Sequence, residues 1–409
     1  MTWRVYGGLP VIELVNNWEC ASFTDTYRPS NLKNQFLHIL HAVQPEVVHV
    51  HNLLNLSFDL PAMARERGAR VVATLHDYTL VCASGGQRIH RSEEHVCRTI
   101  DPERCARCFG ESAFSEQASF ARVTGRAPSV IRKVAVAAAR RYPALARRTA
   151  AMMPAVRGPA VTAHDIVERM RAGTAVLSEM DLVVAPSQSL ASEFVRFGLA
   201  PEKLAVSDNG FAPLAASAKC VWRGDGPLRL GYVGTLAWHK GVHVLIEAVR
   251  ALPPGTVALK VFGDPAVSSS YAAGLRASAA GLPIEFMGPF EHHRRAGVYR
   301  QIDVLVVPSL WLENSPLVIH EAFMAGVPVI GTRLGGVVEL ITEGHNGLLY
   351  DATSPAQLAE AIGTLLRHPE RVAEFTDRLP RVKTLDQDAS DWEDRYRRVM
   401  MDSSESAAS

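Results

Sequence analysis

The sequence predicts an α/β protein of two domains, each built on a parallel β-sheet. With 409 residues the chain is longer than a single hydrophobic core usually serves. In both halves, short β-branched runs alternate with segments of helical length, the pattern of strands joined by crossover helices. Between Pro213 and Pro227 this alternation lapses into small and polar residues, which indicates a linker.

Composition excludes several classes of protein. Hydrophobic residues make up 47% of the chain and charged residues 21%, as in soluble globular proteins. A net charge of +1 and an aromatic content of 7% argue against nucleic acid as a partner. No segment reaches the roughly 18 unbroken apolar residues of a membrane span, and the first residues lack the order of a secretory signal. We therefore expect a cytoplasmic protein.

The first domain is expected over residues 1–212, with an incomplete sheet. The chain opens on a strand-like run at Arg4 to Tyr6, where a nucleotide-binding half would begin with a strand, a glycine-rich turn and a helix. Gly7 and Gly8 lie between two strand-like runs and predict a plain turn. The domain is therefore expected to lack its first βαβ unit. Its expected strands are EVVHVH (46–51), RVVATLHD (70–77), DLVVAPS (181–187) and KLAVSDNG (203–210).

The second domain is expected over residues 228–380 and gives a denser pattern, followed by a C-terminal helix and tail over 381–409. Between its strands, Val242, Leu245, Ile246 and Val249 share one helical face that should pack on the sheet. The expected strands are LRLGYVG, ALKVFGD, IEFMGPF, VLVVPS, PVIGT and GLLYD.

A basic segment interrupts the first domain at residues 121–160. It contains nine Arg or Lys residues and no Asp or Glu, with apolar residues at helical spacing. The pattern predicts one or two basic amphipathic helices. A solvated helical face and a surface that meets anionic lipid or an anionic acceptor are both compatible with it, so peripheral contact with the inner face of a membrane stays open.

The most informative segment runs from Pro308 to Gly331. A buried strand ends at Pro308, and a helix is expected to start with Ser315 as N-cap and Pro316 as its first residue and to end at Gly326. Its free amides near Leu317 and Val318 would face the carboxyl ends of the strands, where an anionic pyrophosphate fits.

Two glutamates and one lysine are the charged candidates for this site. Glu313 precedes the helix and Glu321 lies within it, so they can accept hydrogen bonds from different parts of an elongated ligand such as a nucleotide-sugar. Lys240 lies at the start of another helix, where the helix dipole disfavours an ammonium group unless an anion lies between them. A solvated surface lysine is the alternative.

The spacing of Glu313 and Glu321 within NSPLVIHEAFMAGVPVIG resembles the signature of the retaining GT-B glycosyltransferases of family 4, also called group 1. The resemblance implies a GT-B fold, with two Rossmann-like domains facing a cleft. It covers about residues 180–367 closely and 40–80 more loosely. It also implies that Glu321 binds the ribose, Glu313 contacts the donor sugar and Lys240 contacts the phosphates. Thr235 stands where the family often has an Arg, which removes one expected phosphate contact.

The remaining donor-binding candidates fit the same template. Glycines within VFGDP and EFMGPF, and others in LGGVVELITEGHNGLLY, would let the backbone approach base and sugar, although each alone is as compatible with a turn. The full expected set is Gly234, Thr235, Lys240, Gly263, Gly288, Glu313, Asn314, Ser315, Pro316, Leu317, Val318 and Glu321.

Three histidines lie in or just after the expected strands of the first domain. His76 comes just after a buried strand, and the family has a histidine at the matching place that contacts the donor sugar. With Glu313 and Lys240 it completes the expected catalytic set. The alternation in VVHVH turns His49 and His51 to one face, where a scaffold role is expected and a binding role for His51 stays open.

Four cysteines cluster between residues 82 and 108. Cys82, Cys97, Cys105 and Cys108 are separated by fourteen, seven and two residues, and the last pair has metal-ligand spacing. A structural zinc ion that holds a loop-rich stretch together is one interpretation, and free thiols or a disulfide are the others. No cofactor is expected to be required for catalysis, because Lys240 and helix amides would serve the phosphates.

The expected function is transfer of a sugar, with retention of anomeric configuration, from a nucleotide-diphosphate sugar to a glycan, lipid-linked or small-molecule acceptor, in cell-surface polysaccharide or glycolipid synthesis. The resemblance implies front-face attack, with the donor on the second domain and the acceptor on the first. Two alternatives stay open: a nucleotide-sugar 2-epimerase of the same fold, and a truncated, inactive nucleotide-sugar binder.

Overall fold

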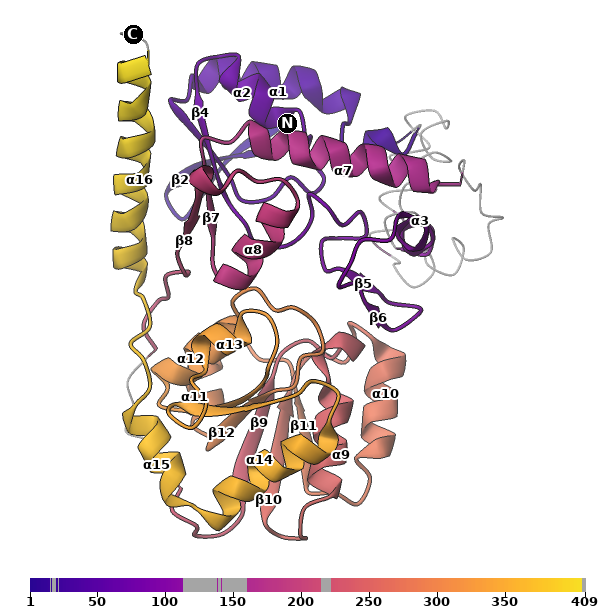
Figure 1. The fold of residues 1–409 in the computed structure, drawn as a ribbon, viewed down its shortest axis with the longest axis vertical. Helices are drawn as coiled ribbons and strands as arrows, with labels where there is room; N and C mark the ends of the chain where they lie inside the picture. Colours follow the sequence, from indigo (N-terminus) through magenta and orange to yellow (C-terminus); the bar gives the residue numbers. More distant parts are fainter. Residues whose placement is uncertain are drawn as a thin grey trace. The chain divides into compact units, whose positions relative to one another are not determined.

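The protein forms two compact units in a computed structural model (Figure 1). One unit comprises Met1–Val184, Phe194–Leu204 and Val399–Ser409, and the other comprises Ala185–Glu193 and Ala205–Arg398. The structure describes residues 1–409 except 15, 17–19, 21, 113–137, 139–140, 142–159, 215–221 and 407–409. The predicted basic helices of segment 121–160, and part of the predicted linker, lie outside the described residues.

The first unit contains a four-stranded sheet in the order β3-β4-β7-β8, in which β3, β4 and β7 pair in parallel. All four strands coincide with predicted runs. They are β3 (Val47–Val50), β4 (Arg70–Thr74), β7 (Leu182–Ala185) and β8 (Leu204–Val206). The helices of this unit are α1 (Ser30–Val43), α2 (Leu60–Arg65), α3 (Pro102–Gly110) and α7 (Ala163–Ser178). Helix α8 (Gln188–Arg196) is divided between the two units, with its residues up to Glu193 in the second.

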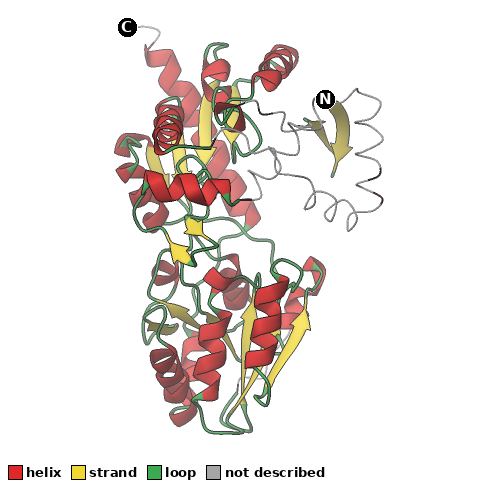
Figure 2. Ribbon diagram, turned by 90° about the vertical axis from the view of Figure 1, so that its right-hand side faces the viewer, coloured by secondary structure: helices red, strands yellow, loops and turns green. Residues whose placement is uncertain are grey.

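Two small hairpins accompany this sheet. Strands β1 (Thr2–Tyr6) and β2 (Leu9–Glu13) pair antiparallel, which confirms the predicted turn, and Gly7 and Gly8 adopt φ of +56° and +83° there. Strands β5 (Ile89–His90) and β6 (His95–Val96) form the second hairpin, just ahead of α3. Both hairpins are drawn as separate pairs of strands in Figure 2.

The second unit contains a parallel six-stranded sheet in the order β11-β10-β9-β12-β13-β14. Every strand matches a predicted run. They are β9 (Leu228–Val233), β10 (Val257–Phe262), β11 (Ile284–Gly288), β12 (Val304–Val307), β13 (Val329–Thr332) and β14 (Gly347–Tyr350). Strand order reverses between β9 and β12, because β10 and β11 extend to one side of β9 and the later strands to the other. Parallel α/β sheets bind ligands at such a switch point.

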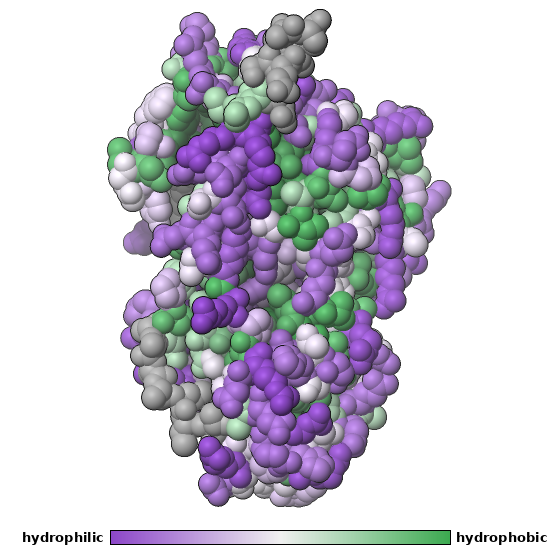
Figure 3. Space-filling model, turned by 60° about the vertical axis from the view of Figure 1, so that its left-hand side comes forward, coloured by the Kyte–Doolittle hydropathy of each residue, from purple (hydrophilic) through white to green (hydrophobic). Residues whose placement is uncertain are grey.

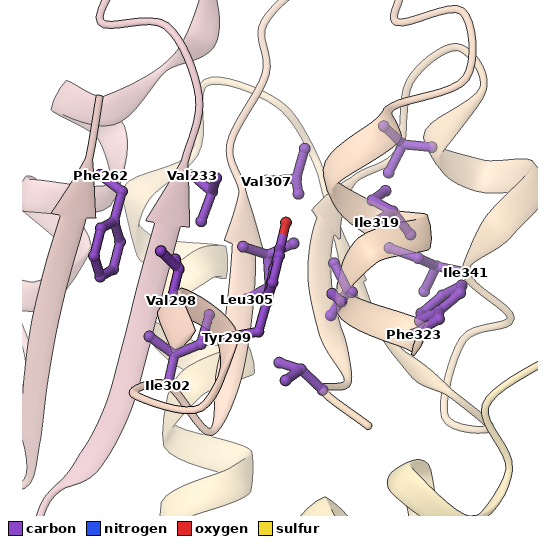
Figure 4. Close-up of a cluster of buried hydrophobic side chains, with 14 residues drawn as sticks. Val233, Phe262, Val298, Tyr299, Ile302, Leu305, Val307, Ile319, Phe323 and Ile341 are labelled. Atoms are coloured by element: carbon purple, nitrogen blue, oxygen red, sulfur yellow. The ribbon is translucent and has the colours of Figure 1, made fainter. Parts of the chain in front are cut away.

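Two groups of helices pack on this sheet. Helix α9 (Val242–Arg250) contacts α10 (Ser269–Ser278) and α14 (Pro355–Arg367), and its predicted apolar face is buried. Side chains of α11 (Arg295–Tyr299), α12 (Leu317–Met324) and α13 (Val337–Leu340) join strand residues in one core cluster (Figure 4). Helices α15 (Glu370–Asp377) and α16 (Leu385–Ser406) complete the chain.

The surface is mixed. The face drawn in Figure 3 is mostly hydrophilic, with smaller groups of apolar residues between the polar ones. Among the described helices, none combines the length and apolar character needed to cross a bilayer.

Candidate functional site

The loops that follow β9 and β12 carry the two most closely paired charges of the candidate site. Lys240 ends a short 3-10 helix (Trp238–Lys240) after β9, and Glu313 lies in the loop after β12. Because β9 and β12 are the neighbouring strands at which the order reverses, both side chains lie at the switch point of the sheet. The sequence placed them at the carboxyl edge but did not predict that they meet.

Lys240 and Glu313 form a buried ion pair. The ammonium Nζ of Lys240 donates to Oε1 of Glu313 at 2.7 Å, and the hydroxyl of Ser309 donates to the same oxygen at 2.5 Å. Only 9% of the Glu313 side chain is exposed, against 23% of Lys240. The ring centroid of Trp311 lies 5.0 Å from Nζ, within range of a cation–π contact. The remaining exposed part of Lys240 can therefore still reach an anionic ligand.

The environment of Glu313 favours its charged form. Burial alone would raise the pKa of Glu313, but the ammonium of Lys240, with hydrogen bonds from Lys240 and Ser309, holds that pKa below its usual value. The carboxylate is therefore ionised at neutral pH. It accepts hydrogen bonds from its neighbours and retains the capacity to accept another from a ligand hydroxyl group.

Close glycine contacts bind the edge loops to one another. A Cβ atom at Gly241 would lie 1.8 Å from the carbonyl oxygen of Pro308, and one at Gly336 would lie 1.8 Å from that of Asn314. Similarly, a Cβ at Gly263 would meet the Gly234 carbonyl oxygen at 2.4 Å. These glycines let the loops after β9, β10, β12 and β13 pack backbone to backbone. Gly263 and Gly336 thus allow loops of the protein to lie close to one another.

Helix α12 begins one residue later than the sequence predicts. Pro316, expected as the first helical residue, is the N-cap, and no side chain caps the helix. Ser315 is not the N-cap: its hydroxyl donates to Oδ1 of Asp208 at 2.8 Å and lies 2.9 Å from Nε2 of His320. The N-cap prediction was wrong because Asp208, from a distant segment, and the side chain of His320 on α12 bind the hydroxyl instead of the helix amides. The first amides, Leu317 and Val318, precede the first intrahelical bond, from Ile319 N to Pro316 O.

Glu321 lies on α12 and is held by two side chains of α11. The hydroxyl of Tyr299 donates to Oε2 at 2.9 Å, and a guanidinium nitrogen of Arg295 lies 3.4 Å from Oε1. Some 14% of the Glu321 side chain remains exposed. The two acids of the motif therefore belong to separate hydrogen-bonding groups, as expected for carboxylates that address different parts of a ligand.

The other predicted donor residues lie at the same edge of the sheet. Thr235 is exposed, and its carbonyl oxygen accepts a hydrogen bond from the Tyr232 hydroxyl at 2.7 Å. Gly288 ends β11 with a φ of +76°. Leu317 is 55% exposed at the first turn of α12. Each follows the carboxyl end of a strand in the second unit.

In the first unit, two histidines meet at the carboxyl edge of the sheet. Nδ1 of His51 lies 2.9 Å from Nε2 of His76, and the His49 ring stacks on His51 with centroids 4.1 Å apart. The two rings of VVHVH therefore share a face, as predicted. Asn52 donates to Oδ2 of Asp77 at 2.9 Å beside them. His51, Asn52, His76 and Asp77 line one pocket, whose floor is apolar.

Both histidines are neutral at pH 7. Burial lowers the pKa of His51, and the neighbouring His76 lowers that pKa further. Burial also lowers the pKa of His76, against the opposing effect of the Asp77 carboxylate. The two rings are thus joined by one N–H···N hydrogen bond, and they are polar groups without net charge.

The four clustered cysteines are free, half-buried thiols. Burial raises the pKa of Cys97 to about 11 and that of Cys105 to about 12, and the negative charge that the neighbouring cysteines would carry adds to both. Cys105 and Cys108 lie one turn apart on α3. Within the described residues, no group of three His, Cys, Asp or Glu side chains is arranged to hold a metal ion. The structural zinc ion remains a prediction.

Several residues of these groups were not predicted. Asp208, Arg295, Tyr299 and His320 in the second unit and Asp77 in the first make direct hydrogen bonds or ion pairs to predicted residues or to their neighbours. His320 and Asp77 adjoin motif residues, which was a usable signal. Tyr299 and Arg295 lie in a different segment from Glu321, and local spacing carries no information about that contact.

Comparison with known proteins finds a family match within the second unit. Residues 227–368 match the family described as Glycosyl transferases group 1. The D-inositol 3-phosphate glycosyltransferase of Corynebacterium glutamicum is 36% identical over 149 residues, which are 34% of this chain and 35% of that protein. The enzyme of the same description from Acidothermus cellulolyticus is 30% identical over 237 residues, 52% of each. The chain thus spans about half, or less, of the length of these curated relatives.

Solved structures share the fold over most of the chain. HepE of Anabaena, in complex with UDP, superposes with a TM-score of 0.56 at 16% identity and covers 92% of this chain and 82% of its own. Sucrose-phosphate synthase from Thermosynechococcus elongatus has a TM-score of 0.58 at 18% identity, covering 92% and 81%. These similarities support the predicted GT-B fold of two Rossmann-like domains.

Proposed function

Since residues 227–368 belong to the glycosyl transferases group 1 family, we propose that the protein is a glycosyltransferase that uses a nucleoside diphosphate sugar as donor. The observation that carries the proposal is the Lys240–Glu313 pair at the switch point of the second sheet, beside the start of α12. A cation and helix amides suit a diphosphate, and a neighbouring carboxylate suits a sugar hydroxyl. This combination fits a donor that carries both groups.

Each charged residue has a distinct role in the proposed site. Lys240 and the amides of Leu317 and Val318 bind the diphosphate. Glu321 accepts hydrogen bonds from the ribose, and Glu313 accepts one from the donor sugar. When the ligand arrives, the Lys240 ammonium shares its three protons between Glu313 and a phosphate oxygen, because an ammonium group has three donors.

The chemistry is stabilisation of a leaving group. As the bond between the anomeric carbon and the diphosphate breaks, negative charge grows on the phosphate oxygen and the sugar becomes oxocarbenium-like. Lys240 and the helix amides stabilise that charge from fixed positions. The acceptor hydroxyl attacks from the same face and gives its proton to the departing phosphate, so configuration is retained. Positioning of donor and acceptor then supplies most of the rate enhancement.

The first unit is proposed to contact the acceptor and, through His76, the donor sugar. Its pocket is lined by neutral imidazoles, an amide and one carboxylate over an apolar floor, groups that bind hydroxylated rings by hydrogen bonds and apolar contact. A glycan or lipid-linked acceptor fits this chemistry. Contact of segment 121–160 with an anionic membrane would bring the enzyme to a lipid-linked acceptor.

A transfer assay tests the proposal. The full chain is incubated with UDP-, GDP- and ADP-sugars and a panel of glycan and lipid acceptors, and release of the nucleoside diphosphate is measured with the anomeric configuration of the product. Lys240→Ala is expected to lower kcat about 10²- to 10³-fold, as for loss of one transition-state donor. Lys260→Ala is the matched control, because Lys260 lies within β10 and donates to Gln301.

Two outcomes would contradict the proposal. One is the absence of binding to any of the nucleotide-sugars, and the other is wild-type turnover by Lys240→Ala. Incubation of the donor alone separates transfer from 2-epimerisation, because an epimerase changes the donor sugar without an acceptor.

A further inference from the structure

The ring of Tyr299 lies in the core of the second unit. Tyr299 ends α11, its side chain is 0% exposed, and it packs in one cluster with Leu305 of β12 and Ile319 and Phe323 of α12. In Figure 4 its ring stands between strand and helix residues, and its hydroxyl points toward the carboxyl ends of the strands. The ring therefore fills space in the core, and the hydroxyl reaches the edge where the candidate site lies.

The hydroxyl has a carboxylate partner that the packing of the ring does not require. It donates to Oε2 of Glu321 at 2.9 Å and lies 3.2 Å from the carbonyl oxygen of Val318, one turn earlier in α12. Arg295, also on α11, approaches the other carboxylate oxygen at 3.4 Å. Each oxygen of Glu321 thus has one protein donor, and a carboxylate oxygen can accept a second hydrogen bond.

The Tyr299 hydroxyl keeps its proton over the working pH range. Burial raises the pKa of Tyr299 well above its ordinary value, and the nearby Glu321 carboxylate raises that pKa further. The hydroxyl is therefore a permanent donor to Glu321. A buried hydrogen bond to a charged group is among the stronger contacts that fix a side chain.

A second buried tyrosine in the same unit provides the contrast. Tyr350, at the end of β14, is 2% exposed, and its hydroxyl has no hydrogen-bond partner among the described residues. A buried tyrosine of this unit is thus accommodated without any partner for its hydroxyl. The contact between Tyr299 and Glu321 is a specific feature of α11 and α12.

We infer that Tyr299 and Arg295 are positioning residues that fix the Glu321 carboxylate for the two hydroxyl groups of a ribose, and so make the site selective for ribonucleotides. This inference rests on the proposed function. Two vicinal hydroxyls need two acceptor oxygens held at a set angle, and donors on both oxygens from one helix fix that angle. If the Tyr299 hydroxyl is removed, the carboxylate can rotate about its last torsion. The ribose hydroxyls then contribute less to the affinity for the nucleotide.

The test compares ribose with a sugar that lacks both hydroxyls. The probe is whichever of UDP, GDP and ADP the wild-type full chain binds most tightly, with its 2′,3′-dideoxy counterpart, each titrated by calorimetry. The wild type is expected to prefer the ribonucleotide by about ten- to a hundredfold, as for loss of hydrogen bonds to a charged group. Tyr299→Phe is expected to lose about tenfold in affinity for the ribonucleotide and less than about twofold for the dideoxynucleotide.

Three further variants make the result decisive. Tyr350→Phe is the matched control, and it is expected to leave both affinities unchanged. Arg295→Gln changes a side chain that is 12% exposed, and it serves as the second test if Tyr299→Phe fails to fold. It is expected to lower the ratio of the affinity for the ribonucleotide to that for the dideoxynucleotide. In a Glu321→Gln background, Tyr299→Phe is expected to have no further effect on the ratio, because the two residues act through one contact.

Failure of this inference is distinguishable from failure of the proposed function. A wild type that binds none of the nucleotides contradicts the proposed function. A wild type that binds ribo- and dideoxynucleotides equally overturns the positioning role together with the ribose role of Glu321, but leaves nucleotide binding itself intact. A folded Tyr299→Phe or Arg295→Gln variant that keeps the wild-type ratio of the two affinities overturns the positioning role alone. An equal loss in both affinities also overturns it, since that result indicates a purely structural residue.

Discussion

The carboxyl edges of the two sheets differ in how they carry charge. In the second unit, Lys240 and Glu313 form a buried ion pair, and Glu321 is held by Arg295 and Tyr299. In the first unit, the described residues that line the pocket include neutral histidines and one carboxylate, Asp77, and none of them is a Lys or Arg. The edge of the second sheet thus carries paired charges of both signs, whereas the pocket of the first carries one carboxylate and no Lys or Arg among its described lining residues.

The difference fits the division of tasks in the proposed function, in which the second unit binds the donor and the first contacts the acceptor. A diphosphate carries concentrated negative charge and needs a cation, whereas a hydroxylated acceptor needs hydrogen-bonding groups and an apolar surface. Burying charge is costly unless the charge is paired, so the charged edge must be built from partners that neutralise each other before a ligand arrives. The Lys240–Glu313 pair meets this requirement.

The largest expected effect comes from breaking the ion pair of the charged edge. Lys240→Met leaves the Glu313 carboxylate buried without its cation, and the free energy of unfolding should fall by about 3–5 kcal/mol. The double variant Lys240→Met/Glu313→Gln should recover much of that loss, because no unpaired charge remains. Urea unfolding of the three proteins measures both effects. A double variant as unstable as the single one would contradict the description of a coupled pair.

The same pair predicts a pH dependence. The fold lowers the pKa of Glu313 from 4.5, so the ionised carboxylate contributes stability above that pH, and the contribution is lost as the pH falls through the lowered value. Glu313→Gln should therefore show a flatter loss of stability on acidification than the wild type. Identical acid profiles of the two proteins would contradict the prediction.

The next largest effect concerns nucleotide affinity. Glu321→Ala removes the proposed ribose ligand and should weaken binding of the preferred nucleoside diphosphate about 10- to 100-fold. Glu285→Ala is the control, because Glu285 lies on β11 of the same unit with 64% of its side chain exposed. If the Glu321 and Glu285 variants bind the nucleoside diphosphate with equal affinity, that result would contradict the ribose role of Glu321.

A smaller effect is expected at the thiol cluster of the first unit. If Cys82, Cys97, Cys105 and Cys108 bind a structural zinc ion, the purified full chain should contain about one equivalent of zinc, and a chelator should lower its melting temperature by several degrees. Cys105→Ser should lose the metal. Metal-free protein with an unchanged melting temperature would leave these residues as free thiols.

The smallest effect is expected at the histidine pair of the first unit. The pKa values of His51 and His76 are lowered in the fold, so their neutral forms contribute stability above pH 6.5 that is lost as the pH falls through the lowered values. His76→Gln should flatten the change in melting temperature over this range. His38→Gln, at a histidine on α1, is the control. A flat wild-type profile would contradict the pairing of these rings.

The sequence predicts the strands better than it predicts the contacts between segments. All six strands of the second sheet were predicted, because buried parallel strands are continuous β-branched runs. The N-cap role of Ser315 was wrong, and the contact of Tyr299 with Glu321 was missed, for one reason. Both depend on residues brought together by the fold from other segments, which local periodicity does not encode.

The sequence predicts where the candidate residues lie, but not which of them contact one another. Lys240, Glu313 and Glu321 were each expected at the carboxyl edge, because they follow strands or begin helices there. That Lys240 donates to Glu313 depends on the order of β9 and β12 in the sheet and on the close contact of Gly241 with Pro308. A glycine in a sequence indicates freedom of the backbone, and only the fold shows which backbone comes close.

Affinity for phosphate tests the central claim most directly. Calorimetric titration of the full chain compares the preferred nucleoside diphosphate with its nucleoside, for the wild type and Lys240→Ala. We predict that the variant loses at least about tenfold in affinity for the diphosphate, as for a lost charged contact, and keeps its affinity for the nucleoside. Equal losses for both ligands, or no loss for either, would contradict a diphosphate site at Lys240.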